Sequence, residues 1–105
     1  MQEAVLRKLF LGFIHIHILH HAKQEPFYGA WMMGELSGHG YEISAGTLYP
    51  ILHGMEKSGL LLVESRTEGG RVRKYYAIAP EGETVLAEAK ARIKELAGEL
   101  HIQVD

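Results

Sequence analysis

The sequence predicts an α+β fold that is mostly α-helical, and three patterns support this prediction. Apolar residues recur at helical spacing in three segments near the N-terminus. Two stretches rich in β-branched and aromatic residues follow, and glycines suited to a hairpin turn separate them. A last helical pattern begins near residue 80. Three helices, a two-stranded wing and one further helix form the architecture of a winged helix-turn-helix domain.

The composition is that of one ordinary globular domain. The chain has 105 residues, of which 47% are hydrophobic and 23% are charged, and this length supports one domain. The net charge of −2 does not mark a nucleic-acid binder, because such domains are typically basic. Any affinity for DNA must therefore come from a local patch. The absence of cysteine excludes disulfides, thiolate metal sites and cysteine nucleophiles, and it fits a reducing compartment such as the cytoplasm.

Residues 4–21 are predicted to form the first helix. Leu6, Leu9 and Phe13 recur at helical spacing, whereas residues 14–18 alternate between isoleucine and histidine, which alone suggests a strand. We choose one continuous helix because the periodic run is long and no turn residue interrupts it. A helix that is apolar on most of its surface must be buried on several sides. In a domain this small, such burial hints at a partner chain.

An apolar run within this segment superficially resembles a secretory signal. It covers residues 9–19 and follows Arg7 and Lys8. His15 and His17 interrupt the run, no cleavage site with small residues follows, and the run is too short to span a bilayer. We therefore interpret it as part of a buried helix and predict no membrane partner.

Residues 23–43 contain one short helix between a turn and a break. The turn is expected at residues 23–27, because Glu25-Pro26 disfavours a continuing helix. Residues 28–37 are predicted to be helical, although two glycines weaken this segment. Gly-His-Gly at residues 38–40 breaks the helix, and three extended residues then lead to the next one.

Residues 44–59 are predicted to form the helix on which function depends. An apolar stripe at residues 48–55 faces inward. Either Ser44 or Thr47 is the N-cap. With Thr47 as the cap, Pro50 lies in the first turn, where a missing N–H costs nothing; with Ser44 as the cap, Pro50 lies inside the helix and removes one internal bond.

The outward face of this helix carries little bulk. It presents Tyr49, His53, Gly54 and Lys57, and Gly59 supplies a left-handed stop at the C-terminal end. A helix with such a bare outer face is predicted to enter a DNA groove, where residues near the N-terminus of a recognition helix reach the base edges.

Residues 60–66 and 71–78 are predicted to be strands joined by a turn at residues 67–70. Four cations lie within nine residues of this hairpin, against the single acid Glu68: Arg66, Arg71, Arg73 and Lys74. A cationic hairpin can lie along a phosphate backbone or reach the minor groove. Taken alone, the pattern favours a solvated charged hairpin. Because the hairpin follows a capped helix whose outer face carries little bulk, the pattern favours DNA binding.

Residues 80–100 are predicted to form the last helix. Pro80 opens it at a favoured first position, and two glutamates follow near the positive end of the helix dipole. Apolar residues spaced 3, 4, 3 and 4 apart form a narrow coiled-coil seam: Leu86, Ala89, Ile93, Leu96 and Leu100. We therefore expect a winged-helix DNA-binding domain at residues 1–79 and a C-terminal dimerisation helix at residues 80–105.

Five short blocks occur in a specific order. They are Y-G-A-W at 28–31, G-T-L-Y-P-I-L at 46–52, M-E-K-S-G-L-L at 55–61, R-K-Y-Y at 73–76 and E-G at 81–82. Together they resemble the PadR family of bacterial transcriptional regulators, over roughly residues 9–90. The short C-terminal part resembles the subgroup with one helix after the wing.

This resemblance implies a dimeric winged-helix repressor of palindromic operator DNA. It also implies a dimer built from the first and last helices, and release from DNA by small aromatic or drug-like effectors. Family members often carry arginine after the residue matching His53, where this chain has Gly54. The central helix therefore offers fewer cationic contacts.

The candidate DNA-binding residues come from the central helix and the wing: Ser44, Thr47, Tyr49, His53, Arg71, Arg73 and Lys74. Hydroxyl groups at a helix N-terminus suit phosphate oxygens. The alternative is that Ser44 and Thr47 only cap the helix and that Tyr49 packs. A cluster that could line an effector pocket, or simply belong to the core, is the following: Phe27, Trp31, Met32 and Met33.

Seven histidines raise the alternative of a metal site. His17 and His21 are four residues apart on one helical face, a spacing that zinc accepts. No acid lies close by as a third ligand, since Glu25 is past the helix, and we therefore predict no metal and no cofactor. The sequence contains neither a Ser/His/Asp arrangement nor a glycine-rich phosphate loop, so we predict no enzyme.

The sequence thus predicts a homodimeric transcriptional regulator. Its expected partners are palindromic double-stranded DNA, a second copy of the chain and a small aromatic effector that releases a repressor. Two alternatives stay open. One is a protein–protein interaction module of the same fold that does not bind DNA, which the net charge of −2 and Gly54 favour. The other is a regulator that senses metal through its histidines.

Overall fold

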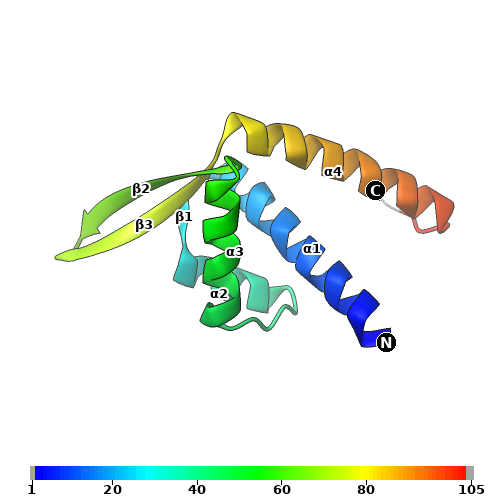
Figure 1. Ribbon diagram of the computed structural model, residues 1–105, viewed down its shortest axis with the longest axis horizontal. Coiled ribbons are helices and arrows are strands. Elements are labelled where there is room, and N and C mark those ends of the chain that lie inside the picture. The colour runs from blue at the N-terminus through cyan, green and yellow to red at the C-terminus, as the bar shows by residue number, and fades with distance from the viewer. Residues whose placement is uncertain (1, 104–105) are drawn as a thin grey trace.

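The structure is a computed structural model that describes residues 2–103. Its elements are, in order, α1 (Gln2–Gln24), β1 (Phe27–Tyr28), α2 (Gly29–Gly38), α3 (Ala45–Lys57), β2 (Leu61–Glu68), β3 (Arg71–Ile78) and α4 (Pro80–Glu99). Figure 1 shows the β2–β3 hairpin projecting from one side of α1–α3, and α4 leaving toward the other side. The predicted fold class is confirmed: the chain is mostly helical and carries a small antiparallel sheet.

α1 runs without interruption through the stretch in which isoleucine and histidine alternate. Ile14 and Ile18, one turn apart, are fully buried. Ile16 lies between them in sequence but is only partly buried. In a strand all three would share one face, whereas in a helix Ile16 points elsewhere. The prediction of one continuous helix is confirmed.

A short strand that the sequence did not predict lies between the first two helices. β1 pairs antiparallel with β3, with Phe27 opposite Tyr76 and Tyr28 opposite Tyr75, and the strand order is β1-β3-β2. The prediction of residues 23–27 as a turn is wrong at both ends, because α1 extends into this segment and Phe27 belongs to a strand. β1 ties the start of α2 to the base of the wing.

Backbone hydrogen bonds fix the N-terminal end of α3. The carbonyl oxygen of Ser44 accepts from the N–H groups of Thr47 and Leu48 at 3.1 and 2.9 Å. Ser44 is therefore the N-cap residue, and Pro50 lies inside the helix. This resolves the choice that the sequence left open.

α3 ends in a Schellman motif at Gly59, whose φ is +81°. The Leu60 N–H donates to the Met55 carbonyl, and the Gly59 N–H donates to the Glu56 carbonyl, both at 2.9 Å. The predicted left-handed stop is confirmed. It turns the chain from α3 directly into β2.

A two-residue turn closes the hairpin. Gly69 and Gly70 have φ of +57° and +78°, as a type I′ turn requires at both central positions. Glu68 lies opposite Arg71 immediately before this turn. The strands therefore extend closer to the tip than predicted, because residues 67–68 belong to β2.

α4 begins where it crosses the corner between α3 and β2. The Ala79 N–H donates to the Leu60 carbonyl at 3.0 Å, and Pro80 occupies the start of the helix as predicted. A Cβ at Gly82 would collide with the same carbonyl oxygen and lie 2.8 Å from Ile78 Cγ1. The close approach of α4 to this corner therefore requires glycine at position 82.

One hydrophobic core joins the helices to the sheet. Its largest fully buried side chains are Ile14, Ile18, Met32, Leu36, Leu48, Leu52, Leu61 and Tyr76. Leu86 of α4 belongs to the same core and is only 4% exposed. Leu86 therefore anchors α4 to its own chain, and its place in a dimer interface stays a prediction.

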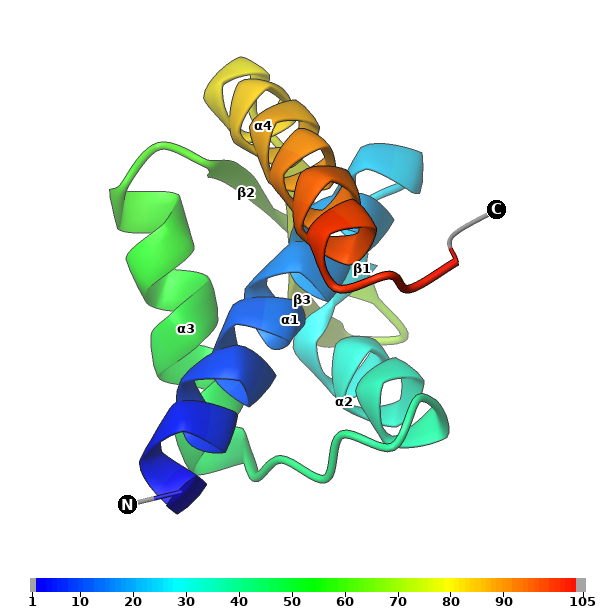
Figure 2. The same ribbon diagram turned by 90° about the vertical axis from the view of Figure 1, so that its right-hand side faces the viewer.

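The molecule is elongated. Its extents are 51 × 30 × 25 Å and its radius of gyration is 14.9 Å, against about 13 Å for a compact chain of roughly this length. The excess comes from the wing, the first half of α1 and the end of α4, which extend away from the core (Figures 1 and 2). Among residues 2–103, each helix is too short or too polar to cross a bilayer.

Candidate nucleic-acid interface

One surface hollow is lined by the start of α2, the outward face of α3 and the wing. Its volume is about 450 Å³. Five of the seven candidate DNA-binding residues come together here from separate elements: Tyr49, His53, Arg71, Arg73 and Lys74. The fold thus joins the α3 face to the cationic strand of the wing.

Tyr49 is held against the first turn of α2. A Cβ at Gly29 would lie 2.5 Å from the Tyr49 hydroxyl oxygen and 2.6 Å from a ring carbon, so the phenol fits because Gly29 has no side chain. Tyr49 is nevertheless 38% exposed and borders the hollow. The two interpretations of Tyr49, packing and DNA contact, are therefore compatible.

Ser44 and Thr47 lie outside the hollow, at the N-terminal end of α3. Their hydroxyl oxygens are 3.2 Å apart, and the Ser44 hydroxyl makes no capping bond to a backbone N–H. The first turn of a helix has N–H groups without intrahelical partners and carries partial positive charge. An anion such as a phosphate is stabilised at this kind of helix end.

Acidic residues partly neutralise two of the wing cations. Arg66 and Arg73 face each other across the hairpin, and like charges in that position destabilise a sheet. Arg66 Nη2 lies 2.7 Å from Glu64 Oε1, and Arg73 Nη1 lies 3.8 Å from Glu68 Oε1. The sequence-based count of one acid overlooked Glu64, because it lies just before the cationic cluster.

Aromatic rings support the same two arginines. The Arg66 guanidinium lies 4.1 Å above the Tyr75 ring, and the Arg73 guanidinium lies 4.3 Å above the Tyr28 ring. The Tyr75 hydroxyl donates to Glu68 Oε1 at 2.7 Å. This hydrogen bond raises the pKa of Tyr75 above its ordinary value. These contacts order one face of the wing.

Arg71 and Lys74 are the wing cations that form no ion pair in the described residues, although Glu68 lies opposite Arg71 across the hairpin. Within residues 2–103 neither side chain forms an ion pair, and both are exposed. Side chains alternate along a strand, so Arg71 and Lys74 lie on opposite faces of β3. They place two positive charges, unpaired within the described part of the chain, beside the hollow.

Gly54 faces away from this hollow. It lies with Pro50 in a shallow depression beside His15 of α1. A Cβ at Gly54 would meet nothing within 4 Å. Packing within the chain therefore does not require glycine at this position.

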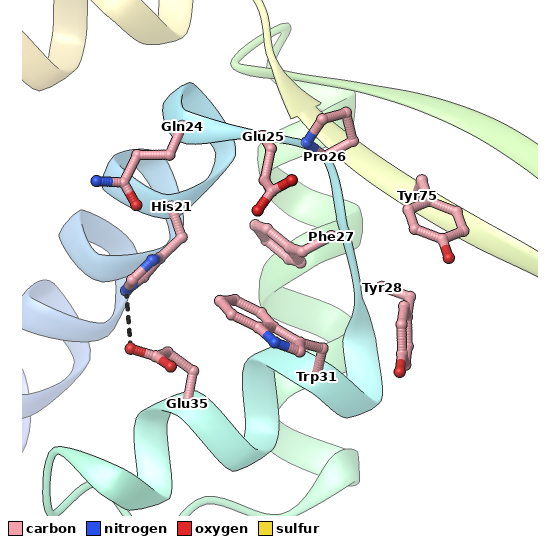
Figure 3. Close-up of a pocket in the computed structure, with 9 residues that line it drawn as sticks. All are labelled: His21, Gln24, Glu25, Pro26, Phe27, Tyr28, Trp31, Glu35 and Tyr75. Atoms are coloured by element: carbon pink, nitrogen blue, oxygen red, sulfur yellow. Dashed lines mark ion pairs between the residues drawn. The ribbon is translucent and has the colours of Figure 1, made fainter.

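A second hollow of about 370 Å³ opens between the end of α1, β1 and α2. Figure 3 shows the rings of Phe27 and Trp31 beside each other, with the carboxylates of Glu25 and Glu35 nearby. The two rings are stacked with centroids 6.0 Å apart. This hollow offers an aromatic surface together with acidic groups.

The candidate effector cluster is only partly brought together. Phe27 and Trp31 line the second hollow, but Met32 and Met33 do not. Met32 is fully buried in the core, and Met33 packs against it. The core interpretation is therefore correct for the two methionines, because they lie on the face of α2 that is turned inward.

Large apolar side chains on α1 and α4 remain exposed. They are Val5, Leu6, Leu9 and Phe13 on α1, and Val85, Ile93, Leu96 and Leu100 on α4. Leu6 is 63% exposed and Leu100 is 56% exposed. A groove of about 390 Å³ lies between the two helices, with Phe13 and Leu86 in its walls. Exposed apolar surface of this kind marks a protein-interaction site.

The structure brings a third histidine to the pair on α1. Ligand atoms of His17, His21 and His39 all lie within 4.8 Å of one another, and Glu35 Oε2 lies 3.4 Å from His21 Nε2. The prediction that no acid lies near this pair is wrong. That prediction considered only residues adjacent in sequence, whereas Glu35 and His39 come from α2 and its C-terminal end.

Comparison with known proteins gives a consistent result. The sequence model of the transcriptional regulator PadR-like family matches residues 18–88. Transcriptional regulator Rv3488 of Mycobacterium tuberculosis is 44% identical over 95 residues, which cover 90% of this chain and 89% of that protein.

Solved structures with the same fold include a PadR family transcriptional regulator from Eggerthella lenta. Its TM-score is 0.82 at 33% identity, with 94% of this chain and 88% of that chain covered. A PadR-like transcription factor from Bacteroides fragilis has a TM-score of 0.81 at 29% identity, with 93% and 96% covered. These similarities cover the wing and most of the helices.

Proposed function

Because the chain belongs to the PadR-like family of transcriptional regulators, we propose that it is a homodimeric repressor that binds a palindromic operator in double-stranded DNA. The proposed DNA-binding part is residues 1–79, and residues 80–105 form the dimerisation helix. The observation that carries this proposal is the hollow in which the exposed face of α3 meets the cations of β3.

In the proposed binding mode, α3 and the wing contact different parts of the DNA. α3 enters the major groove, with Tyr49 and His53 facing the bases and with Ser44 and Thr47 near a phosphate at the positive end of the helix. Arg71 and Lys74 bind phosphates of the flanking backbone, and Arg73 adds charge from the hollow. The cations of the wing supply most of the electrostatic attraction in a chain whose net charge is −2.

The exposed apolar faces of α1 and α4 support a homodimer. These side chains are exposed, and Figure 1 shows the N-terminal part of α1 and the C-terminal part of α4 extending away from the wing. Pairing of two copies through these faces would bury them and relate the two α3 helices by a two-fold axis. Such a dimer reads two half-sites about one helical turn, or a multiple of it, apart.

The hollow beside Phe27 and Trp31 supports release by a small aromatic effector. An aromatic ring can stack on these side chains, and Glu25 and Glu35 offer acceptors at the same place. β1 connects this hollow to the base of the wing through Tyr28 and Tyr75. An effector bound here would contact the segment that links α2 to the wing.

DNA selection from a random library at a stated salt concentration tests the DNA-binding proposal. An enriched palindrome is the expected outcome, and expression of a reporter gene behind that palindrome should fall when the protein is produced. If no sequence is enriched, the proposal is overturned in favour of an interaction module of the same fold. The net charge of −2 is the feature that favours that alternative.

Replacing Arg71 and Lys74 by alanine tests the role of the wing. Binding should weaken for every DNA sequence, and the slope of log affinity against log salt should become shallower by about 2, one for each lost phosphate contact. Fluorescence anisotropy at several salt concentrations measures both quantities. Arg92→Ala is the matched control, because Arg92 is a cation on α4 paired with Glu88. Unchanged affinity in the double variant would contradict the wing assignment.

A further inference from the structure

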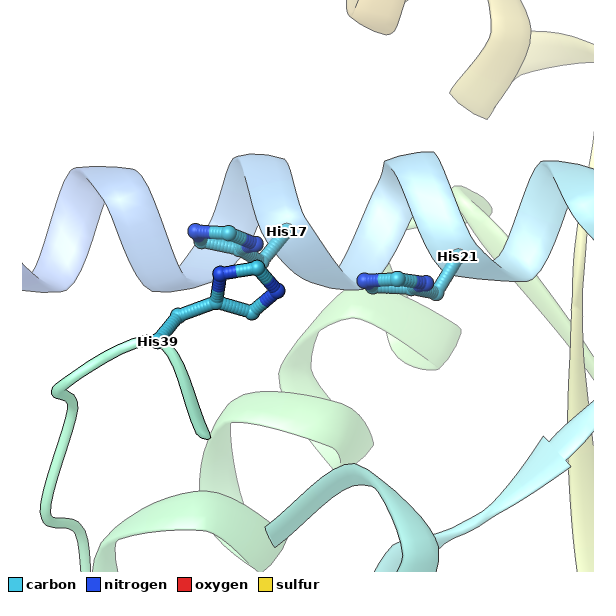
Figure 4. Close-up of side chains that lie close together, drawn as sticks. All are labelled: His17, His21 and His39. Atoms are coloured by element: carbon cyan, nitrogen blue, oxygen red, sulfur yellow. The ribbon is translucent and has the colours of Figure 1, made fainter. Parts of the chain in front are cut away.

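Three histidines converge where the C-terminal half of α1 meets the C-terminal end of α2. His17 and His21 are one turn apart on α1, and their stacked rings have centroids 6.2 Å apart. His39 is the C-cap residue of α2, and its ring centroid lies 4.9 Å from that of His17. Figure 4 shows the His39 side chain directed toward the two rings of α1. Ligand atoms of all three lie within 4.8 Å of one another.

A carboxylate completes the cluster. Glu35 Oε2 lies 3.4 Å from His21 Nε2 and 3.1 Å from His39 Nε2. Glu35 is four residues before His39, so the two side chains share one face of α2. One oxygen donor thus stands between two of the three imidazoles.

We propose that His17, His21 and His39, with Glu35 as the fourth ligand, bind one divalent transition-metal ion per chain, of which Zn²⁺ is the representative. Imidazole nitrogen suits Zn, Cu, Ni and Fe, and three imidazoles with one carboxylate oxygen form a tetrahedral set. The proposed site is distinct from the DNA-binding hollow and does not depend on DNA binding, but His21 and Glu35 also line the second hollow.

The geometry requires only small side-chain movements. Zn–N bonds of about 2.0–2.1 Å imply that the nitrogens of a tetrahedral site lie about 3.4 Å apart. In the structure the ligand atoms of the three histidines lie within 4.8 Å of one another. His17 and His21 are fixed at the right spacing by the helix. The His39 N–H donates to the Leu36 carbonyl at 3.0 Å, which holds the backbone of the turn. The imidazole of His39 is half-exposed and contacts the Glu35 carboxylate, so the two can turn together toward the α1 pair.

The Glu35 carboxylate places a negative charge beside His21 and His39, and this charge attracts a cation. A histidine binds metal through the lone pair of its neutral imidazole. Bound metal would link α1 to the turn after α2, from which residues 39–44 run to the start of α3.

Titration of the untagged, chelator-treated protein with Zn²⁺ tests this proposal without DNA. Calorimetry should give one ion per chain, and saturating Zn²⁺ should raise the melting temperature, because a ligand that binds only the folded state stabilises it. Co²⁺ serves as a spectroscopic probe, and its intense visible absorption should indicate tetrahedral coordination. Failure of the wild-type protein to bind Zn²⁺ at micromolar concentrations would overturn the proposal.

Variants distinguish this site from scattered surface histidines. His39→Gln and Glu35→Gln should each weaken Zn²⁺ binding at least tenfold, since even an outer-shell partner typically contributes about 10–100-fold. His39 is exposed and Glu35 is partly exposed, so the variants should fold normally by circular dichroism. His15→Gln is the matched control on α1, because the His15 ring bonds its own helix at the Leu11 carbonyl. Equal binding by His39→Gln would show that only the α1 pair binds metal and would refute the four-ligand site.

Discussion

At the scale of single residues, the surroundings of His17 and His21 set their protonation. Burial is the main cause that lowers the pKa of both imidazoles, and neighbouring histidines add repulsion to any charged form. Glu35 acts in the opposite direction but does not outweigh burial. The titratable groups that face this pair come from three parts of the fold: His20 on α1, Glu35, His39 and Tyr41 at and after α2, and Lys90 on α4.

The stability of the metal-free protein should therefore fall as the pH drops below about 6.5. Above that pH the imidazoles are neutral in both the folded and the unfolded state. Below it the unfolded chain binds protons first, because the folded-state pKa values of His17 and His21 are lowered. Urea unfolding between pH 8 and 5 measures the decline. His17→Gln should make it shallower; an unchanged pH dependence in this variant would contradict the assignment.

Single residues also show where sequence reasoning stops. The cationic cluster of the wing was visible in the sequence, but the sequence did not show which of its side chains form ion pairs. Arg66 and Arg73 are engaged by Glu64, Glu68 and two tyrosines, whereas Arg71 and Lys74 are not. Register alone does not give that distinction, because Glu68 lies directly opposite Arg71 and yet its carboxylate pairs with Arg73. It depends on the conformations of the side chains.

At the scale of elements, the attachment of α4 to the winged domain depends on one close contact. The first turn of α4 lies against the Leu60 carbonyl at the corner between α3 and β2, and Gly82 leaves the space for it. Leu86, one turn further along, then reaches the core. The direction in which α4 leaves the domain is therefore set within its first two turns.

Gly82→Ala should destabilise the protein by about 1–3 kcal/mol, because the added methyl group meets a backbone oxygen that cannot move aside. Gly98→Ala is the matched control on the same helix. A Cβ at Gly98 would meet nothing within 4 Å, so this change should stabilise the helix by up to about 1 kcal/mol. Urea denaturation at one fixed protein concentration compares the two variants. Equal stabilities would refute the proposed steric role of Gly82.

Element boundaries were predictable where the local signal was strong. Gly59, the Gly69-Gly70 pair and Pro80 each mark the end or the start of an element as expected. β1 was missed because two residues are too few for any periodicity and its only partner is the distant β3. The N-cap of α3 was left open because Ser44 and Thr47 both carry hydroxyl groups, and backbone hydrogen bonds decide between them.

At the scale of the whole molecule, the elongated shape separates two surfaces. The wing and α3 form the cationic hollow at one end, while α1 and α4 carry exposed apolar side chains that extend away from it. One face of each helix packs on the core through Ile14, Ile18 and Leu86, while other apolar side chains of both helices stay exposed. The apolar faces are therefore available to a second copy.

Ile93→Asp should convert the proposed homodimer to a monomer, because it introduces a carboxylate into the apolar face of α4. Ile93 is 39% exposed in the single chain, so the change should leave the fold intact. Ala91→Asp adds the same charge on the polar side of the helix and should leave the dimer intact. Light scattering after size-exclusion chromatography measures the mass. A dimer that survives Ile93→Asp would place the contact elsewhere.

The alternating charges of β2 have a further consequence for the behaviour of the protein in solution. Within the described residues β2 pairs only with β3, so its other side is an open sheet edge that could accept a strand from another molecule. Glu64, Arg66 and Glu68 point from one face of this edge strand. Any incoming strand would have to desolvate these charges, which discourages edge-to-edge aggregation. The same ion pairs that moderate the charge of the wing thus help to keep an exposed hairpin from recruiting further strands.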